Sequence, residues 1–178
     1  HLGKTDAMKV SQHFGTLYTL LVIGQIVLCN YGQLSPYVLL SMLPAMVLCI
    51  PPSTSTIAGL LIAFISGFSV DWLSEGILGL NTAAILPVAL MRKGIIRIFL
   101  GEDIITRGDK FSYRKNGFAK ISAAHSVCLI IFLGLYIILD GAGTLPAWFC
   151  LAKGGISFAC NFILAIIVTN ILAPDDRK

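Results

Sequence analysis

Residues 57–73 read IAGLLIAFISGFSVDWL, a run whose only charged residue is Asp71, near its end. A helix that crosses the hydrocarbon core of a bilayer needs about 20 residues of this composition, with its backbone groups bonded within the helix. The run therefore predicts a transmembrane helix.

Five further apolar runs, separated by Pro, Gly and polar residues, lie on either side of this one. The six runs together predict an all-α polytopic integral membrane protein, a compact bundle of about six transmembrane helices. The run at 37–50 contains Pro44 and, at about 1.5 Å per residue, is shorter than a bilayer core of roughly 30 Å. We expect this run to be kinked or re-entrant. The other runs cover residues 14–29, 78–91, 121–139 and 154–172.

The bulk composition agrees with a membrane protein. Hydrophobic residues make up 56% of the chain and charged residues 12%, and the mean hydropathy is +0.85. Soluble domains carry roughly 25% charged residues, so water is not the main solvent of this chain.

The Lys and Arg residues are distributed very unevenly between the predicted loops. If the chain crosses the membrane six times with its N-terminus inside, Lys153 is the only one of the 13 that lies outside. Because Lys and Arg are retained in cytoplasmic loops, we expect both termini to be cytoplasmic. The net charge of +4 is then a signal of topology and not of nucleic-acid binding.

This topology divides the chain into a cytoplasmic segment 1–13, a single transmembrane domain 14–172 and a cytoplasmic tail 173–178. Met8 could be the natural start, and residues 1–7 are left out of the functional interpretation. We expect a basic cytoplasmic loop over residues 92–120. Within it, residues 94–100 either form a helix at the headgroup boundary or extend the preceding helix.

Small residues at Gly59, Ala63 and Gly67 are spaced four apart in the opening run. This spacing lets two helix backbones approach closely in lipid, so we expect a tight helix contact, with a neighbour inside the chain or in another protein. Asp71 is either solvated at the interface, capping the next turn, or hydrogen-bonded inside the bundle. In a passive scaffold we expect Asp71→Asn to be tolerated, because an amide still accepts a hydrogen bond.

The remaining polar residues favour structural roles. We expect His125 to be a core histidine bonded to a backbone carbonyl or to Ser126, and the five cysteines to pack as apolar residues without metal or disulfide. We expect no cofactor and no enzymatic activity, because common hydrolase, metalloprotease and nucleotide-binding motifs are missing from the sequence. Inter-helix hydrogen bonds are expected from Asn81, Asn161 and Asn170.

Three stretches in order, GFSVDWLS at 67–74, LGLNTAA at 78–84 and Met91-Arg92, resemble the rod shape-determining protein MreD family. The likeness extends over most of the chain and is greatest to forms from the Bacteroidota branch, which also share an acidic turn at Glu102-Asp103. It rests on order and spacing more than on any single residue. The positions carried over from the family motif are Gly67, Asp71, Gly79, Asn81 and Arg92.

The resemblance implies a non-catalytic membrane scaffold subunit of the elongation complex in the bacterial inner membrane, which organises peptidoglycan synthesis and cell shape. The partners it implies are MreC, the RodA glycosyltransferase and a class B penicillin-binding transpeptidase, with MreB as a further candidate and membrane lipid around the bundle. Helix-packing or partner-interface residues are then expected at Gly59, Ala63, Gly67, Asp71, Gly79, Asn81 and Arg92.

The alternative is the substrate-binding component of an energy-coupling-factor vitamin transporter, which is also a compact six-helix protein. That family docks through small residues four apart in its first helix, but residues 14–29 contain no alanine. The predicted outer loops at 30–35 and 140–146 are also short for gripping a ligand.

Overall fold

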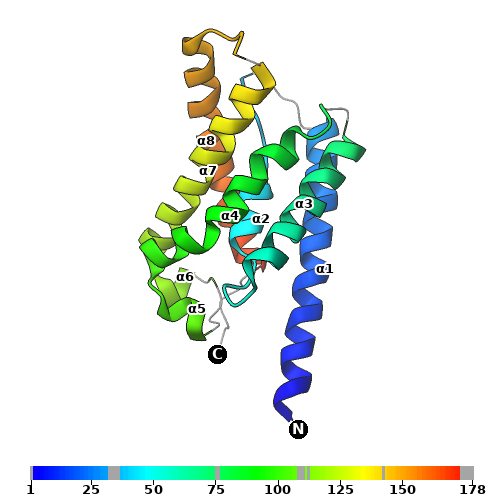
Figure 1. The fold of residues 1–178 in the computed structure, drawn as a ribbon, viewed down its shortest axis with the longest axis vertical. Helices are drawn as coiled ribbons and strands as arrows, with labels where there is room; N and C mark the ends of the chain where they lie inside the picture. Colours follow the sequence, from blue (N-terminus) through cyan, green and yellow to red (C-terminus); the bar gives the residue numbers. More distant parts are fainter. Residues whose placement is uncertain are drawn as a thin grey trace.

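The computed structural model describes residues 2–31, 37–74, 77–107, 111, 113–141 and 143–172, with side chains from His13 onward. Every regular element in these residues is a helix. Five long helices run beside one another along the length of the molecule, and the short α2 lies among them (Figure 1). The long helices are α1 (Leu2–Tyr31), α3 (Thr56–Leu73), α4 (Leu80–Leu100), α7 (Phe118–Gly141) and α8 (Ala147–Leu172).

Four helices in the described residues are long and apolar enough to cross a membrane, so the structure agrees with a membrane protein. They are α1 from His13, α3, α7 and α8. The helix α4 is as long as these, but it carries Arg92, Lys93 and Arg97. Sequence-predicted runs at 57–73, 121–139 and 154–172 thus correspond to α3, α7 and α8.

The run at 37–50 is not one helix. Residues 38–42 are non-helical, and only Leu43–Leu48 form the helix α2, with Pro44 in its first turn, where proline is tolerated. Every side chain from Leu43 to Ile50 is buried, and α2 contacts all five long helices. The core of the bundle is therefore built around this broken segment.

The expected basic loop at 92–120 is largely helical. Of the two alternatives for residues 94–100, the structure has the extension, since α4 continues without a break to Leu100. Two short helices follow, α5 (Asp103–Arg107) and α6 (Tyr113–Asn116), before α7 begins at Phe118. We call the end of the bundle that carries α5, α6 and the 51–55 turn the basic end, and the opposite end, where α3 ends and α4 begins, the far end.

Candidate functional site

The small residues of α3 face α4. A Cβ atom added to Gly67 would lie 2.9 Å from the Cα of Thr82, closer than real Cβ atoms come to a backbone, and 3.1 Å from Cγ2 of Ile85, which is tighter than most real contacts. Ala63 is fully buried on the same face, and a Cβ on Gly59 would lie 3.5 Å from the Nη1 atom of Arg92. The tight contact predicted from the spacing is therefore present, and its neighbour is internal.

Asp71 caps the start of α4. Its carboxylate is 3% exposed. One oxygen accepts from the backbone and side-chain nitrogens of Asn81, at 3.0 and 2.9 Å, and the other accepts from the backbone nitrogen and hydroxyl of Thr82, at 3.0 and 2.8 Å. Two of these donors are unpaired N–H groups of the first turn of α4, where the helix dipole also favours a negative charge. Gly79 precedes the helix with φ of +90°, which an L residue rarely adopts.

The geometry argues against the expectation that Asp71→Asn is tolerated. Both carboxylate oxygens of Asp71 accept two hydrogen bonds each. An asparagine has one carbonyl oxygen, and its NH₂ group would face donors in place of the second oxygen. The amide is therefore a poor substitute. Of the open alternatives for Asp71, the structure excludes solvation at the interface, because the side chain is hydrogen-bonded inside the bundle and caps the start of α4.

Arg92 bonds to the end of α2. It is 1% exposed, and its Nη2 atom donates to the carbonyl oxygens of Ile50, at 2.6 Å, and Pro51, at 2.7 Å. Carbonyls that follow the last turn of a helix lack intrahelical donors, and a cation is favourable there. No carboxylate pairs with Arg92 in the part of the chain that the structure describes. The predicted position of Arg92 in a cytoplasmic loop is wrong, since the residue lies inside the bundle.

The seven residues predicted as packing or interface positions thus all belong to the α3–α4 pair. One group gathers where α3 ends and α4 begins, and the other lies toward the start of α3, where Gly59 approaches Arg92. The first group is Gly67, Asp71, Gly79 and Asn81, and the second is Gly59, Ala63 and Arg92. Apart from Gly79, which is half-buried, these residues are buried inside the chain, so they are not an open surface for another protein.

A second polar group, of which only Asn161 was predicted from the sequence, supports the non-helical stretch 37–42. Gln25 on α1 accepts from the nitrogen of Met42 at 2.7 Å and donates to the oxygen of Leu40 at 3.2 Å. Asn161 on α8 accepts from the nitrogen of Ser41 at 2.8 Å and donates to the oxygen of Leu39 at 2.7 Å.

Backbone groups in this stretch alternate between two neighbours, as in a β-strand. Residues 39 and 41 face α8, where Ser157 also accepts from the nitrogen of Leu39 at 2.9 Å, and residues 40 and 42 face α1. Non-helical backbone is tolerated at membrane depth only where protein groups satisfy it. The expected inter-helix bond of Asn161 is in fact a bond to this backbone. A signal for Gln25 was available in the sequence, since it is the only amide of the apolar run 14–29. Asn170 is exposed.

His125 lies buried between α7 and α8. The expected partners were a backbone carbonyl or Ser126, but its Nε2 atom lies 2.7 Å from the hydroxyl of Thr169, and Ser126 donates to the oxygen of Ser122. The Thr169 hydroxyl donates its own hydrogen to the oxygen of Ala165. When the hydroxyl hydrogen of Thr169 is donated to Ala165, the Nε2 of His125 is the donor of this pair.

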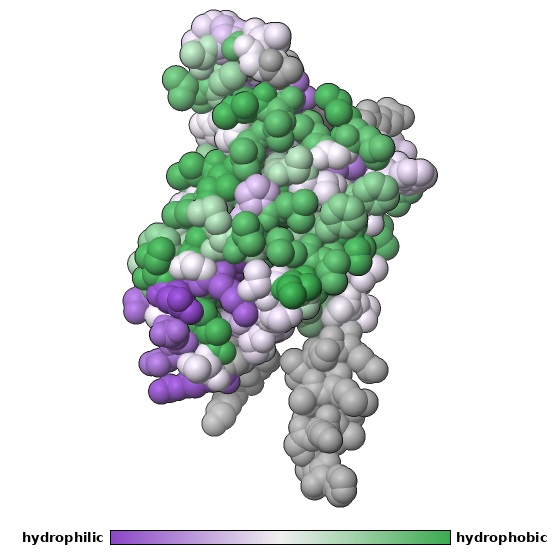
Figure 2. Space-filling model, viewed as in Figure 1, coloured by the Kyte–Doolittle hydropathy of each residue, from purple (hydrophilic) through white to green (hydrophobic). Residues whose placement is uncertain are grey.

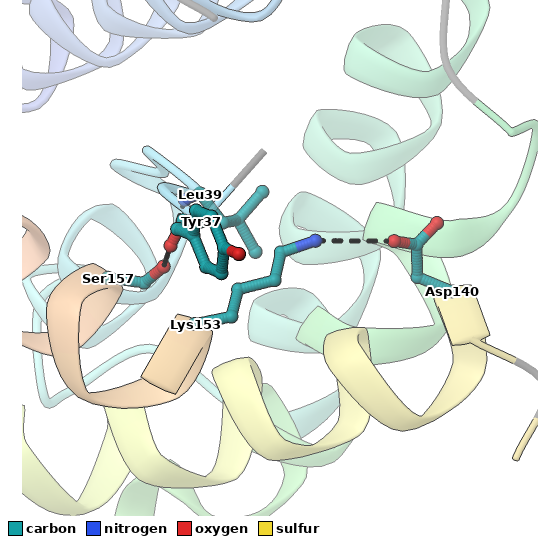
Figure 3. Close-up of polar contacts among 5 residues, drawn as sticks. All are labelled: Tyr37, Leu39, Asp140, Lys153 and Ser157. Carbon is teal, nitrogen blue, oxygen red and sulfur yellow. Dashed lines mark hydrogen bonds and ion pairs between the residues drawn. The ribbon is translucent and has the colours of Figure 1, made fainter. Parts of the chain in front are cut away.

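At the far end, Lys153 on α8 is held between neighbours. Figure 3 shows its ammonium directed at Asp140, near the end of α7, with 3.4 Å between the nitrogen and the carboxylate oxygen. One turn further along α8, the hydroxyl of Ser157 donates to the oxygen of Tyr37 at 3.4 Å. The one cation expected outside is therefore neutralised by a carboxylate of the same chain.

The five cysteines are free. Within the described ranges, no group of three His, Cys, Asp or Glu side chains is placed to hold a metal ion. Comparison with protein-family models, with curated proteins and with solved structures finds no match for this chain.

Proposed function

We propose that this chain is a non-catalytic scaffold subunit of the bacterial rod complex, which holds peptidoglycan-synthesis proteins in place in the membrane. The sequence resemblance to the MreD family motivates the proposal. Its proposed partners are MreC, RodA and the class B penicillin-binding transpeptidase, with MreB as a further candidate.

The observation that carries the proposal is the use made of the two buried charges. Asp71 is bonded to four donors at the start of α4, and Arg92 to two carbonyls at the end of α2. Each side chain bonds from one helix of this chain to the backbone at the end of another. This use fits a protein whose task is to keep a fixed shape, whereas a transport pathway needs a charge that meets a substrate or ion.

We also propose that the chain crosses the bacterial inner membrane six times, with both termini cytoplasmic. The segment 37–50 supports a sixth crossing, because strand-like residues advance about 3.3 Å each and helical residues about 1.5 Å. On this basis residues 37–42 and 43–50 together cover about 32 Å, close to the roughly 30 Å of a bilayer core. The orientation rests on the exposed cations gathered at the basic end.

Cysteine labelling of intact cells tests this orientation. A membrane-impermeant maleimide should modify Thr144→Cys, which lies in the exposed turn before α8, and leave Lys115→Cys, on α6, unmodified until the cells are opened. The unsubstituted protein measures the background from the five native cysteines. The reverse pattern would overturn the orientation.

Co-purification from native membranes tests the function. The tagged chain is extracted in mild detergent and the proteins that stay bound are identified. Retention of MreC, RodA or the transpeptidase supports the proposal. A bound vitamin together with an ATPase module would instead establish the transporter alternative.

A matched pair of variants ties this test to the structure. Gly67→Leu disrupts the α3–α4 contact, whereas Gly134→Leu adds the same side chain to α7 where an added Cβ would meet no neighbouring side chain or other helix within 4 Å. If the bundle acts by its shape, Gly67→Leu should reduce partner retention and cell-shape complementation together. Loss of cell shape with full partner retention would contradict a passive scaffold.

A further inference from the structure

The short helices after α4 are fixed to the bundle by two side chains. Ile104 on α5 and Phe111, just before α6, are buried in the main hydrophobic core. The ring of Phe111 meets that of His125 edge-on, with 5.7 Å between the ring centroids. Both helices also contact their neighbours, α5 against α4 and α6 against α7. The surface around them is therefore part of the folded domain.

This anchoring turns the cations of the region outward, and Figure 2 shows hydrophilic side chains gathered over the basic end. Among the described residues of α5, α6 and their flanks, the only exposed carboxylates are those of Glu102 and Asp103. Glu102 forms an ion pair with Arg97 at 3.2 Å, with both side chains more than 60% exposed, so the pair neutralises little. The exposed cations are Arg97, Arg107, Arg114, Lys115 and Lys120.

Apolar side chains are exposed among these cations. Ile98 is 77% exposed beside Arg97, and Phe118 is 56% exposed two residues before Lys120, with its ring stacked on Tyr113. Cations interleaved with exposed aliphatic and aromatic groups, directly next to membrane-length helices, fit the headgroup zone of a bilayer. A soluble acidic protein would satisfy the charges but leave Ile98 and Phe118 without an apolar environment.

We propose that the basic end binds the phosphate groups of anionic phospholipids through Arg107, Lys115 and Lys120. These three cations have no carboxylate partner in the described part of the chain. The far end offers no equivalent, because its cation Lys153 is paired with Asp140. This lipid site does not depend on the rod complex, and a failure to retain MreC would leave it intact.

Binding of labelled lipids to the purified full chain tests the site. Fluorescent phosphatidylglycerol is titrated into the protein in neutral detergent at low salt, with fluorescent phosphatidylethanolamine as the lipid without net charge. Each cation near an anionic surface changes affinity roughly fivefold. The variant Arg107→Gln/Lys115→Gln/Lys120→Gln should therefore bind phosphatidylglycerol roughly 100-fold more weakly and phosphatidylethanolamine unchanged.

Three comparisons complete the experiment. Lys153→Gln at the far end should leave binding unchanged, and Glu102→Gln/Asp103→Asn should strengthen it. Inorganic phosphate, compared with chloride at equal ionic strength, should not displace the lipid, and efficient displacement would reassign the site to free phosphate. Equal phosphatidylglycerol affinity of the wild type and the triple variant would overturn the proposal. A triple variant that binds lipid normally but no longer retains an acidic soluble protein would also overturn it.

Discussion

The α3–α4 pair and the segment 37–50 satisfy their backbone hydrogen-bonding groups in opposite ways. In α3 and α4, nearly all backbone groups bond within each helix, and side chains are needed only at the ends, where Asp71 caps α4. In the segment 37–50, the non-helical half has no partners of its own. Its backbone groups bond to Gln25, Ser157 and Asn161, which belong to other helices.

The difference shows where specificity lies in an apolar bundle. Lipid and protein interior are equally apolar, so burial of hydrocarbon does little to choose one helix neighbour over another. The neighbour is instead selected by the close backbone approach at Gly67 and by the directed hydrogen bonds of Gln25 and Asn161. Four predictions follow from this comparison, from the largest expected effect to the smallest.

The double variant Gln25→Leu/Asn161→Leu should have the largest effect. It leaves the N–H groups of Ser41 and Met42 and the carbonyls of Leu39 and Leu40 without their present partners. Each unsatisfied buried group costs about 1–3 kcal/mol, so we expect the free energy of unfolding to fall by at least about 4 kcal/mol. Unfolding in mixed micelles by increasing fractions of dodecyl sulfate measures it.

Asn170→Leu is the control for this variant. The position also lies on α8, but the side chain is exposed, so the change should leave stability nearly constant. An equal loss in both proteins would mean that amide content, and not support of the 37–42 backbone, determines stability.

Asp71→Asn should come next. Two of the four donors at the start of α4 lose their acceptor, which we expect to lower the free energy of unfolding by about 2–3 kcal/mol. Asp140→Asn, which changes a half-buried carboxylate at the end of α7, should cost less than about 1 kcal/mol. The same micelle titration applies, and a fully stable Asp71→Asn protein would show that the cap is dispensable.

Gly67→Leu should lower stability by roughly 1–3 kcal/mol, because the new side chain meets the backbone of α4 and the helices must separate. Gly134→Leu on α7 should be neutral or slightly stabilising, since its new side chain has open space and leucine favours helix. Comparable stability of the two variants in the same titration would show that the close contact at Gly67 does not contribute to the stability of the bundle.

Arg97→Gln should have the smallest effect, about 0.5 kcal/mol or less. The Arg97–Glu102 ion pair is exposed on both sides, and water screens its attraction. The double-mutant cycle with Glu102→Gln measures the coupling between the two side chains, and a coupling above about 1 kcal/mol would mean that the region is less hydrated than its exposure indicates.

The sequence predicted the regular helices well, because hydropathy reports long apolar segments directly. Spacing of Gly59, Ala63 and Gly67 also predicted a close contact, although the neighbour could not be read from one helix alone. The segment 37–50 and the position of Arg92 were harder. Hydropathy has no term for a strand-like backbone inside a bundle, and it places an arginine in a loop even where two carbonyls of another segment bind it.

The hydrogen bonds that support the 37–42 backbone also determine the order in which segments of the nascent chain can insert into the membrane. The bonds from Leu39 to Ser157 and from Ser41 to Asn161 join residues 118 and 120 positions apart. A ribosome adds roughly 5–20 residues per second, so the segment is made roughly 6–24 s before α8 can reach it. During that interval the backbone groups of Leu39 and Ser41 lack their α8 partners, which is disfavoured in lipid. In a nascent chain arrested before residue 157, the segment 37–50 should therefore lie outside the bilayer. We expect it to insert only after α8 has emerged.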